Sequence, residues 1–225
     1  MPPACPPSVA TPSANPLQRR GMMVVLASPP GGGKTSVSRA VMARDPLTTI
    51  SVSATTRAMR PGEVEGTHYY FMDKPAFEDL IAKGEMLEHA LVYNNYLYGT
   101  PKAPVEKALQ TGRDVLFDID WQGNRSLSRS APDDVVSIFL LPPSWSALAD
   151  RLRTRAQDSE EEIVRRLSKA RDEIDHYTEF QYVIVNHDLN ETVGHVQDII
   201  AAERHRRHRL TALAPFVETL TPGKS

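Results

Sequence analysis

The chain has 225 residues, a length typical of one domain with small inserts. Its formal net charge of −2 provides no overall basic field, so we expect no nucleic acid partner. The single Cys5 excludes an internal disulfide framework and a multi-cysteine metal site, and it makes a reducing, cytoplasmic setting the expected one. No apolar run approaches the ~20 residues that span a membrane, so we expect no membrane partner either.

The two ends of the chain differ from the segment between them. Residues 1–20 alternate proline with alanine and serine and lack the apolar stretch of a secretory signal, which predicts a disordered tail. We expect a second, short tail over residues 216–225 and one folded domain over residues 21–215.

The first ordered segment is an apolar run, residues 22–27, followed by a glycine-rich turn and a helical pattern. The turn reads Ser28-Pro29-Pro30-Gly31-Gly32-Gly33-Lys34-Thr35. Strand, glycine-rich turn, Lys-Thr and helix is the order that a phosphate-binding loop requires. Backbone N–H groups and the positive helix end would bind phosphate, Lys34 would reach the outer phosphates, and Thr35 would bind Mg²⁺. The alternative is a glycine hinge beside a surface lysine, which the flanking strand and helix disfavour.

Apolar runs and helical patterns alternate through the rest of the chain. The predicted strands are residues 50–53, 68–72, 86–93, 115–120, 135–141 and 182–185. Capping patterns predict that helices begin at Thr100, Ser144, Ser159 and Asn190. The alternation predicts a mostly parallel sheet that is covered by helices.

Two segments interrupt the alternation. Residues 57–105 have an antiparallel-looking pattern and form a predicted insert, and residues 151–165 form a charged helical excursion. The remaining core is residues 21–56, 106–150 and 166–215. Two excursions from one phosphate-binding core suggest two mobile flaps over two substrates.

Several short motifs, in order along residues 21–210, resemble the signature of the guanylate kinase family. They include Ser51-Val52-Ser53-Ala54-Thr55-Thr56-Arg57, Arg60-Pro61-Gly62-Glu63, Gly84-Glu85-Met86-Leu87-Glu88, Tyr98-Gly99-Thr100-Pro101 and Asp118-Ile119-Asp120-Trp121-Gln122-Gly123. The resemblance implies an α/β P-loop kinase with a parallel five-stranded core sheet flanked by helices, an antiparallel GMP-binding insert and a helical lid. It also implies phosphoryl transfer from ATP to GMP, and to dGMP, within purine nucleotide metabolism.

The resemblance implies roles for individual residues around ATP. The ATP-binding residues would be Ser28, Pro29, Pro30, Gly31, Gly32, Gly33, Lys34, Thr35 and Ser36, with Mg²⁺ on Thr35 and Asp118. The catalytic cations would be Lys34, Arg57, Arg151, Arg155 and Arg166. Taken alone, the last three arginines would read as a solvated helix face, the usual place of charge runs.

The resemblance also assigns the GMP site. Its residues would be Ser53, Arg57, Arg60, Tyr69, Glu88, Tyr98, Thr100 and Asp120. Arginines and hydroxyls suit the dianionic phosphate of GMP. The carboxylates of Glu88 and Asp120 would accept from the adjacent N1–H and amino donors of guanine, whereas adenine has an unprotonated N1 there. Asp118 and Asp120 share a strand face at i and i+2, although a strand end meeting solvent would produce the same pair.

The sequence departs from the family pattern in three ways. Ser28 replaces the usual first glycine of the phosphate loop. The segment 93–98 is one residue longer than usual, so Tyr98, rather than Tyr96, is the expected phosphate-binding tyrosine. Thr154 and Ala156 stand where the lid usually has glycines, which would stiffen its motion.

Other interpretations compete with an active kinase. Guanylate-kinase-like domains of membrane scaffolds keep the fold and bind phosphopeptides in the GMP cleft, but the intact Lys34 and Thr35 favour an enzyme. A kinase of another phosphorylated acceptor would not explain Glu88 together with Asp120. The basic run 204–209 could bind phosphate or nucleic acid, and we interpret it instead as the solvated end of the last helix.

Overall fold

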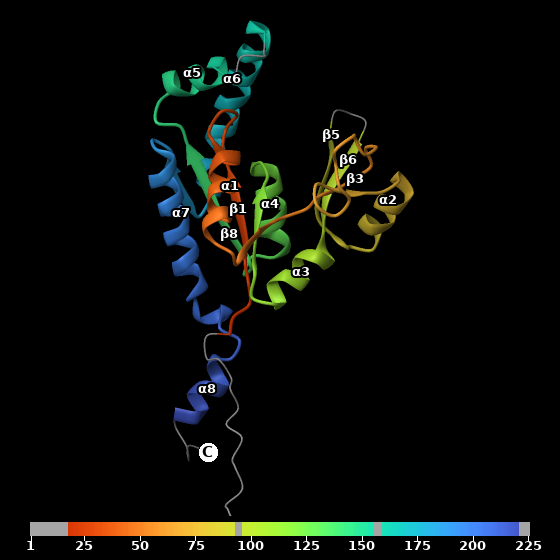
Figure 1. Ribbon diagram of the computed structural model, residues 1–225, viewed down its shortest axis with the longest axis vertical. Coiled ribbons are helices and arrows are strands. Elements are labelled where there is room, and N and C mark those ends of the chain that lie inside the picture. The colour runs from red at the N-terminus through yellow and green to blue at the C-terminus, as the bar shows by residue number, and fades with distance from the viewer. Residues whose placement is uncertain (1–17, 93–95, 155–158, 221–225) are drawn as a thin grey trace, which may run out of the picture.

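The computed structural model describes residues 18–92, 96–154 and 159–220 (Figure 1). Its main sheet has five strands, all parallel, in the order β2-β7-β1-β8-β9. The strands are β1 Met23–Ala27, β2 Thr48–Ile50, β7 Asp114–Asp118, β8 Val135–Leu141 and β9 Tyr182–Val185. The predicted five-stranded parallel sheet is therefore confirmed. The central strand β1 is buried along its whole length, as a strand covered by helices on both faces must be.

Helices cover both faces of this sheet. The covering helices are α1 Lys34–Arg44, α3 Lys102–Gln110, α4 Trp121–Ser130 and α7 Leu189–Arg204. The other helices are α5 Trp145–Thr154, α6 Glu160–Ile174 and α8 Leu213–Leu220, with short 3₁₀ helices η1 Asp175–Glu179 and η2 Arg207–Arg209. Successive residues of β1 point to opposite faces. Val24 packs in a core with α1 and α7, and Val25 packs in a second core with α3 and α4. Figure 1 shows α7 and α4 on opposite sides of the sheet, with α5 and α6 beyond its upper end.

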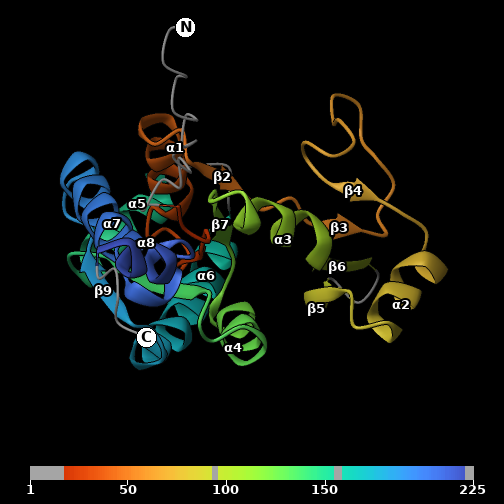
Figure 2. The ribbon, with the colours of Figure 1, turned by 90° about the horizontal axis from the view of Figure 1, so that it is seen from below.

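A second, smaller sheet stands to one side of the core. Its strands, in the order β4-β3-β6-β5, are β3 Ala54–Thr55, β4 Tyr70–Phe71, β5 Met86–Val92 and β6 Tyr96–Pro101, and α2 Lys74–Ala82 packs beside them. The pairs β3–β6 and β5–β6 are antiparallel, and β3–β4 is parallel. Figure 2 shows this sheet set apart from the core, with α3 between them. The first strand of this sheet, β3, begins at Ala54, whereas the insert was expected to begin at residue 57.

Four sequence predictions of local structure within the domain are wrong. The strand expected over residues 115–120 ends at Asp118, and Asp120 is the N-cap of α4, so the two acids do not share a strand face. Residues 50–53 are not one strand: β2 ends at Ile50, and Ser51 to Ser53 pass from the first sheet to the second. Thr100 does not cap α3, because it lies buried within β6 and the helix begins two residues later. The last long helix begins at Leu189, since the carboxylate of Asp188 accepts the backbone N–H groups that follow it. The predicted tail over 216–225 overlaps α8, which ends at Leu220.

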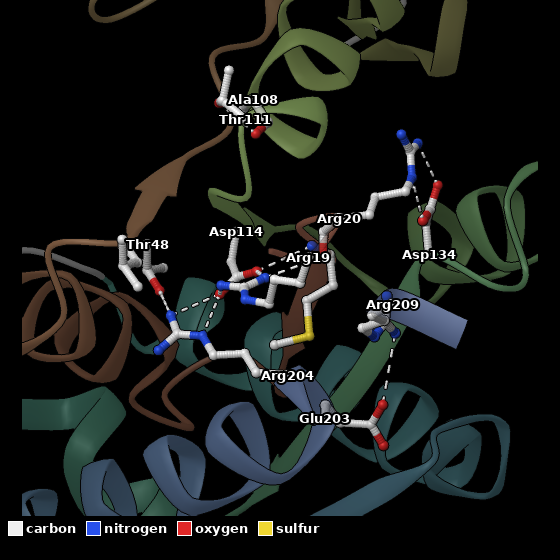
Figure 3. A network of polar contacts seen from close by, with 12 residues as sticks. Arg19, Arg20, Thr48, Ala108, Thr111, Asp114, Asp134, Glu203, Arg204 and Arg209 are labelled. Atoms are coloured by element: carbon white, nitrogen blue, oxygen red, sulfur yellow. Dashed lines mark hydrogen bonds and ion pairs between the residues drawn. The ribbon is translucent and has the colours of Figure 1, made fainter. Parts of the chain in front are cut away.

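A network of ion pairs lies at the amino end of the parallel strands (Figure 3). Asp114, the first residue of β7, is 0% exposed, and it accepts from the guanidinium groups of Arg19 and Arg204 at 2.6–2.9 Å. Arg204 also pairs with Asp45, and Arg209 is 2% exposed beside Glu203. The interpretation of 204–209 as a solvated helix end is therefore wrong for Arg204 and Arg209, because buried carboxylates bind both.

Candidate active site

The phosphate loop lies where sequence predicted it, between β1 and α1. Gly31 and Gly33 have φ angles of 83° and 96°, a region that residues with a side chain rarely adopt. The helix begins at Lys34, and no side chain caps its N-terminus. Its first backbone N–H groups and its positive dipole end are therefore available to an anion.

Ser28 and Gly32 are matched to each other within this loop. The Ser28 hydroxyl donates to the carbonyl of Pro29 at 3.1 Å, and the Gly32 N–H donates to the same carbonyl at 2.8 Å. A Cβ atom at Gly32 would lie 2.7 Å from the Cβ of Ser28. The loop thus accommodates a serine in its first position because the residue facing it is a glycine.

Asn186 holds the loop from the carboxyl end of β9, and sequence analysis assigned it no role. It follows β9 and is 5% exposed. Its side-chain amide donates to the carbonyl of Gly32 at 2.8 Å, and its carbonyl oxygen accepts from the Thr192 hydroxyl at 3.0 Å. A Cβ at Gly33 would lie 2.5 Å from the same amide nitrogen. The available signal was its place at the carboxyl end of a parallel strand, where α/β sheets bind ligands.

Lys34 and Asp118 meet at the carboxyl edge of the sheet. Asp118 ends β7, and in the sheet it lies beside Leu26 of β1. The Lys34 ammonium lies 2.8 Å from the Asp118 carboxylate and donates to the Ile119 carbonyl at 3.0 Å. Thr35 is exposed in the first turn of α1. The cation of the loop and the acid expected to hold Mg²⁺ are thus adjacent.

A cavity of about 420 Å³ lies between the core and the second sheet. Of the eight residues expected around GMP, Ser53, Glu88, Tyr98 and Asp120 line it. Asp120 also lines the cavity of about 260 Å³ that the phosphate loop encloses. One residue therefore belongs to the wall of both cavities.

Glu88 and Asp120 are oriented by different partners. The Thr100 hydroxyl donates to the Glu88 carboxylate at 2.7 Å. Thr100 is not among the residues that line the cavity, but it contacts one that is. Burial raises the pKa of Glu88; the Thr100 hydrogen bond opposes this rise and the charge of Asp120 adds to it. Asp120 is the N-cap of α4, and its Oδ1 accepts from the backbone N–H groups of Gln122 and Gly123 at 3.1 and 3.0 Å.

The remaining expected GMP residues gather around Arg57. Its guanidinium forms a two-pronged ion pair with Glu63 at 2.7 and 3.0 Å and donates to the Tyr98 hydroxyl at 3.2 Å. The centre of the Tyr69 ring lies 5.4 Å from the guanidinium carbon of Arg57. The backbone N–H of Arg60 donates to the carboxylate of Glu63. Hydrogen bonding to Arg57 lowers the pKa of Glu63. The sequence prediction did not include Glu63, although it lies three residues after Arg60.

The expected lid arginines are only partly described. Arg151 on α5 donates to the carbonyl of Asn186 at 3.1 Å and lines a hollow of about 470 Å³ beside Gly31, Gly33 and Ser36. Arg166 on α6 lines the phosphate-loop cavity. Arg155 lies outside the described residues. Two residues that sequence analysis did not single out, Lys169 and Glu173, line the same cavity as Arg166.

Within the described ranges 18–92, 96–154 and 159–220, none of the helices is both long and apolar enough to cross a membrane. Those ranges also hold no cluster of three or more His, Cys, Asp or Glu side chains that could bind a metal without a substrate's help. This is compatible with Mg²⁺, which is commonly held by one or two carboxylates plus substrate phosphates.

Comparison with known proteins agrees with this geometry. The family model described as guanylate kinase matches residues 20–203. The chain is 51% identical to a guanylate kinase of Paramagnetospirillum magneticum, over 92% of this chain and 97% of that protein. It is 53% identical to one of Bradyrhizobium diazoefficiens, over 91% and 93%. A crystal structure of guanylate kinase from Anaplasma phagocytophilum superposes with a TM-score of 0.71 at 35% identity, covering 92% of this chain and 99% of that one.

Proposed function

The chain belongs to the guanylate kinase family, and we propose that its phosphate-loop cavity holds ATP while the cavity between the two sheets holds GMP. The reaction is the ATP-dependent phosphorylation of GMP to GDP, and the chain is an ATP:GMP phosphotransferase. The observation that best supports this division is the position of Asp120, which lines both cavities. Donor and acceptor bound in those cavities would meet beside it, as direct transfer requires.

On the acceptor side, Arg57, Arg60, Tyr69 and Tyr98 bind the phosphate of GMP together with Ser53. Arg57 already donates to Tyr98, and Glu63 holds its guanidinium in a fixed plane. A prepositioned arginine loses less entropy when a phosphate binds. The arrangement therefore provides charge and directional donors before the substrate arrives.

Guanine is recognised by Glu88, Thr100 and Asp120. The Thr100 hydroxyl fixes the rotamer of Glu88 through a 2.7 Å hydrogen bond, and the carboxylate accepts from the donor edge of guanine. The same buried carboxylate would face the unprotonated N1 of AMP, and both groups would then lack a donor. That mismatch excludes AMP more strongly than a lost contact would.

On the donor side, residues 28–36 bind the phosphates of ATP, and the hollow beside Arg151 has the size and position to take its adenosine. Thr35 and Asp118 offer a hydroxyl and a carboxylate, which are oxygen ligands suited to Mg²⁺ when phosphates complete the coordination. Bound there, Mg²⁺ would neutralise charge on the phosphates. Asp118 is held at the loop by Lys34, which fits this role.

Catalysis then depends on position and charge rather than on a general base. Lys34 meets the outer phosphates, and Arg151, Arg155 and Arg166 close on the transferring group. Closure of the lid over both cavities would also exclude water, which limits loss of the phosphoryl group to hydrolysis. We place the reaction in the cytoplasm, since the only thiol, that of Cys5, is compatible with a reducing compartment.

A coupled assay that detects ADP tests the proposal. The full chain is given MgATP with GMP, dGMP, AMP, CMP or UMP in turn. We expect turnover with GMP and dGMP and, for AMP, a kcat/KM lower by about 10⁴-fold or more. An absence of turnover with GMP, combined with binding of a phosphopeptide, would contradict the kinase assignment and support the binding-module alternative.

A further inference from the structure

Three side chains of α6 face the phosphate-loop cavity together. Arg166, Lys169 and Glu173 are spaced i, i+3 and i+7, which places them on one face of the helix. All three line the cavity that the phosphate loop and Asp120 complete. The helix therefore presents two cations and one carboxylate to the space that the phosphates of ATP would occupy.

The carboxylate of Glu173 needs an explanation in a cavity for anions. Its side chain is 9% exposed, and burial raises its pKa, while the charges of Lys169 and Lys34 oppose the rise. An ionised carboxylate there would repel phosphates unless a cation matches it. The Lys169 ammonium, 3.3 Å from the Glu173 carboxylate, is such a cation.

Lys169 is the more mobile partner. Its side chain is 64% exposed, and a lysine carries its charge on a flexible four-carbon stem. An ion pair with one partner this exposed contributes little to stability, so the pair is poorly explained as a device for folding. It does keep the ammonium at the mouth of the cavity instead of in bulk solvent.

We propose that Lys169 is a further catalytic cation, which contacts the transferring phosphoryl group, and that Glu173 is a positioning residue that holds the Lys169 ammonium at the cavity before ATP binds. This inference rests on the proposed function. As the phosphoryl group transfers, its oxygens compete with Glu173 for the ammonium, and a charge-assisted hydrogen bond to them forms in the transition state. The bond between the γ-phosphorus of ATP and its bridging oxygen breaks as a phosphate oxygen of GMP bonds to that phosphorus, and the products are ADP and GDP.

The first experiment removes the charge of one of two neighbouring cations on α6, Lys169 or Arg165, in separate variants. Lys169→Met keeps the length of the side chain, and Arg165→Met removes a neighbouring charge whose side chain is 76% exposed and pairs instead with Glu162 at 2.8 Å. For Lys169→Met we expect kcat to fall about 10–100-fold while the Kd of ATP or GMP alone changes less than about threefold. Arg165→Met and Lys169→Arg would retain most of the activity. Equal effects of Lys169→Met and Arg165→Met would overturn the proposal.

A double-mutant cycle tests whether Glu173 positions Lys169 or has only a structural role. If Glu173 acts through Lys169, Glu173→Gln lowers kcat several-fold in the native background and has little effect in the Lys169→Met background. Independent, multiplicative losses would refute the positioning role, and thermal melts of each variant identify any loss caused by unfolding. Failure of the native chain to phosphorylate GMP would instead contradict the proposed function, so the two failures are distinguishable.

Discussion

Lys34, the first residue of α1, and Asp118, the last residue of β7, form a 2.8 Å ion pair at the carboxyl edge of the main sheet. Their side chains are 21% and 32% exposed, so the pair stabilises the fold by at most about 1 kcal/mol. Its importance lies in where it keeps the two charges. The ammonium remains at the carboxyl end of β7, and the carboxylate remains beside the first residue of α1.

We expect Lys34→Met to lower kcat by about 10²–10³-fold or more, because a cation aimed at the outer phosphates is lost where charge redistributes during transfer. The melting temperature would change little, since the ion pair contributes little stability. Steady-state kinetics and a thermal melt measure the two effects. Asp118→Asn is the control: it removes the same pair but keeps the lysine, and it would raise the Mg²⁺ concentration that activity requires. Near-normal turnover in Lys34→Met would contradict the phosphate-loop assignment.

Glu88→Gln would weaken GMP recognition and relax discrimination against AMP. The amide keeps one acceptor and turns a donor toward the donors of guanine, which costs about 1.5–3 kcal/mol, or about 10–150-fold in kcat/KM for GMP. The Thr100 hydroxyl can still donate to the amide oxygen, so the fold remains intact. Kinetics with GMP and AMP check both directions. Unchanged GMP kinetics would place base recognition on other residues.

Features that depend on neighbouring residues were predictable from sequence. The phosphate loop, β8 and the Ser144 and Ser159 caps are patterns within a few residues, and the structure contains each of them. Thr100 shows the limit of such patterns. A threonine before a proline looks like a helix cap, yet here it lies within a strand, because β6 pairs with β5 and buries the hydroxyl against Glu88.

Contacts between distant residues were not predictable in this way. The Asn186 amide and the Gly32 carbonyl are 154 positions apart, and the parallel pairings of β1 with β8 and of β8 with β9 bring them together. Arg204 was expected in solvent because charges usually favour a helix C-terminus. Its carboxylate partners, Asp45 and Asp114, lie 159 and 90 residues earlier in the chain.

The ion pairs of Arg20 predict a specific loss of stability in acid. Arg20 binds Glu106 of α3 and Asp134 before β8, and its hydrogen bond lowers the pKa of Glu106 to about 2. Because the folded-state pKa lies below the unfolded value of about 4.3, the pair stabilises the fold above that value. The contribution is lost as pH falls through the window from about 4.3 to about 2.

Thermal melts of the native chain and of Glu106→Gln across pH 7 to pH 2 test this. The difference in melting temperature between them would be constant above about pH 5 and shrink toward zero near pH 2. Glu78→Gln, on the exposed surface of α2, is a control and would show a small difference at each pH. A Glu106→Gln difference that does not vary with pH would contradict the role of the Arg20 pair.

Asp114→Asn would destabilise the protein without altering its chemistry. The Asp114 carboxylate is 0% exposed and accepts from Arg19 and from Arg204 (Figure 3). It also accepts from the backbone N–H of Met22. The amide removes the buried charge that both partly buried guanidinium groups face, and breaking a buried pair costs about 3–5 kcal/mol. For a chain of this size, the melting temperature would fall by about 6–20 °C.

Position explains why activity would persist below the unfolding transition. Asp114 begins β7 and Asp118 ends it, so the network and the catalytic edge lie about 13 Å apart along one strand. We therefore expect kcat and KM of Asp114→Asn at 15 °C to remain within about twofold of the native values, since separated sites act nearly independently. Asp198→Asn makes the same change at an exposed position of α7 and would leave the melting temperature nearly unchanged. A melting temperature of Asp114→Asn equal to that of Asp198→Asn would show that the network does not hold the base of the sheet together.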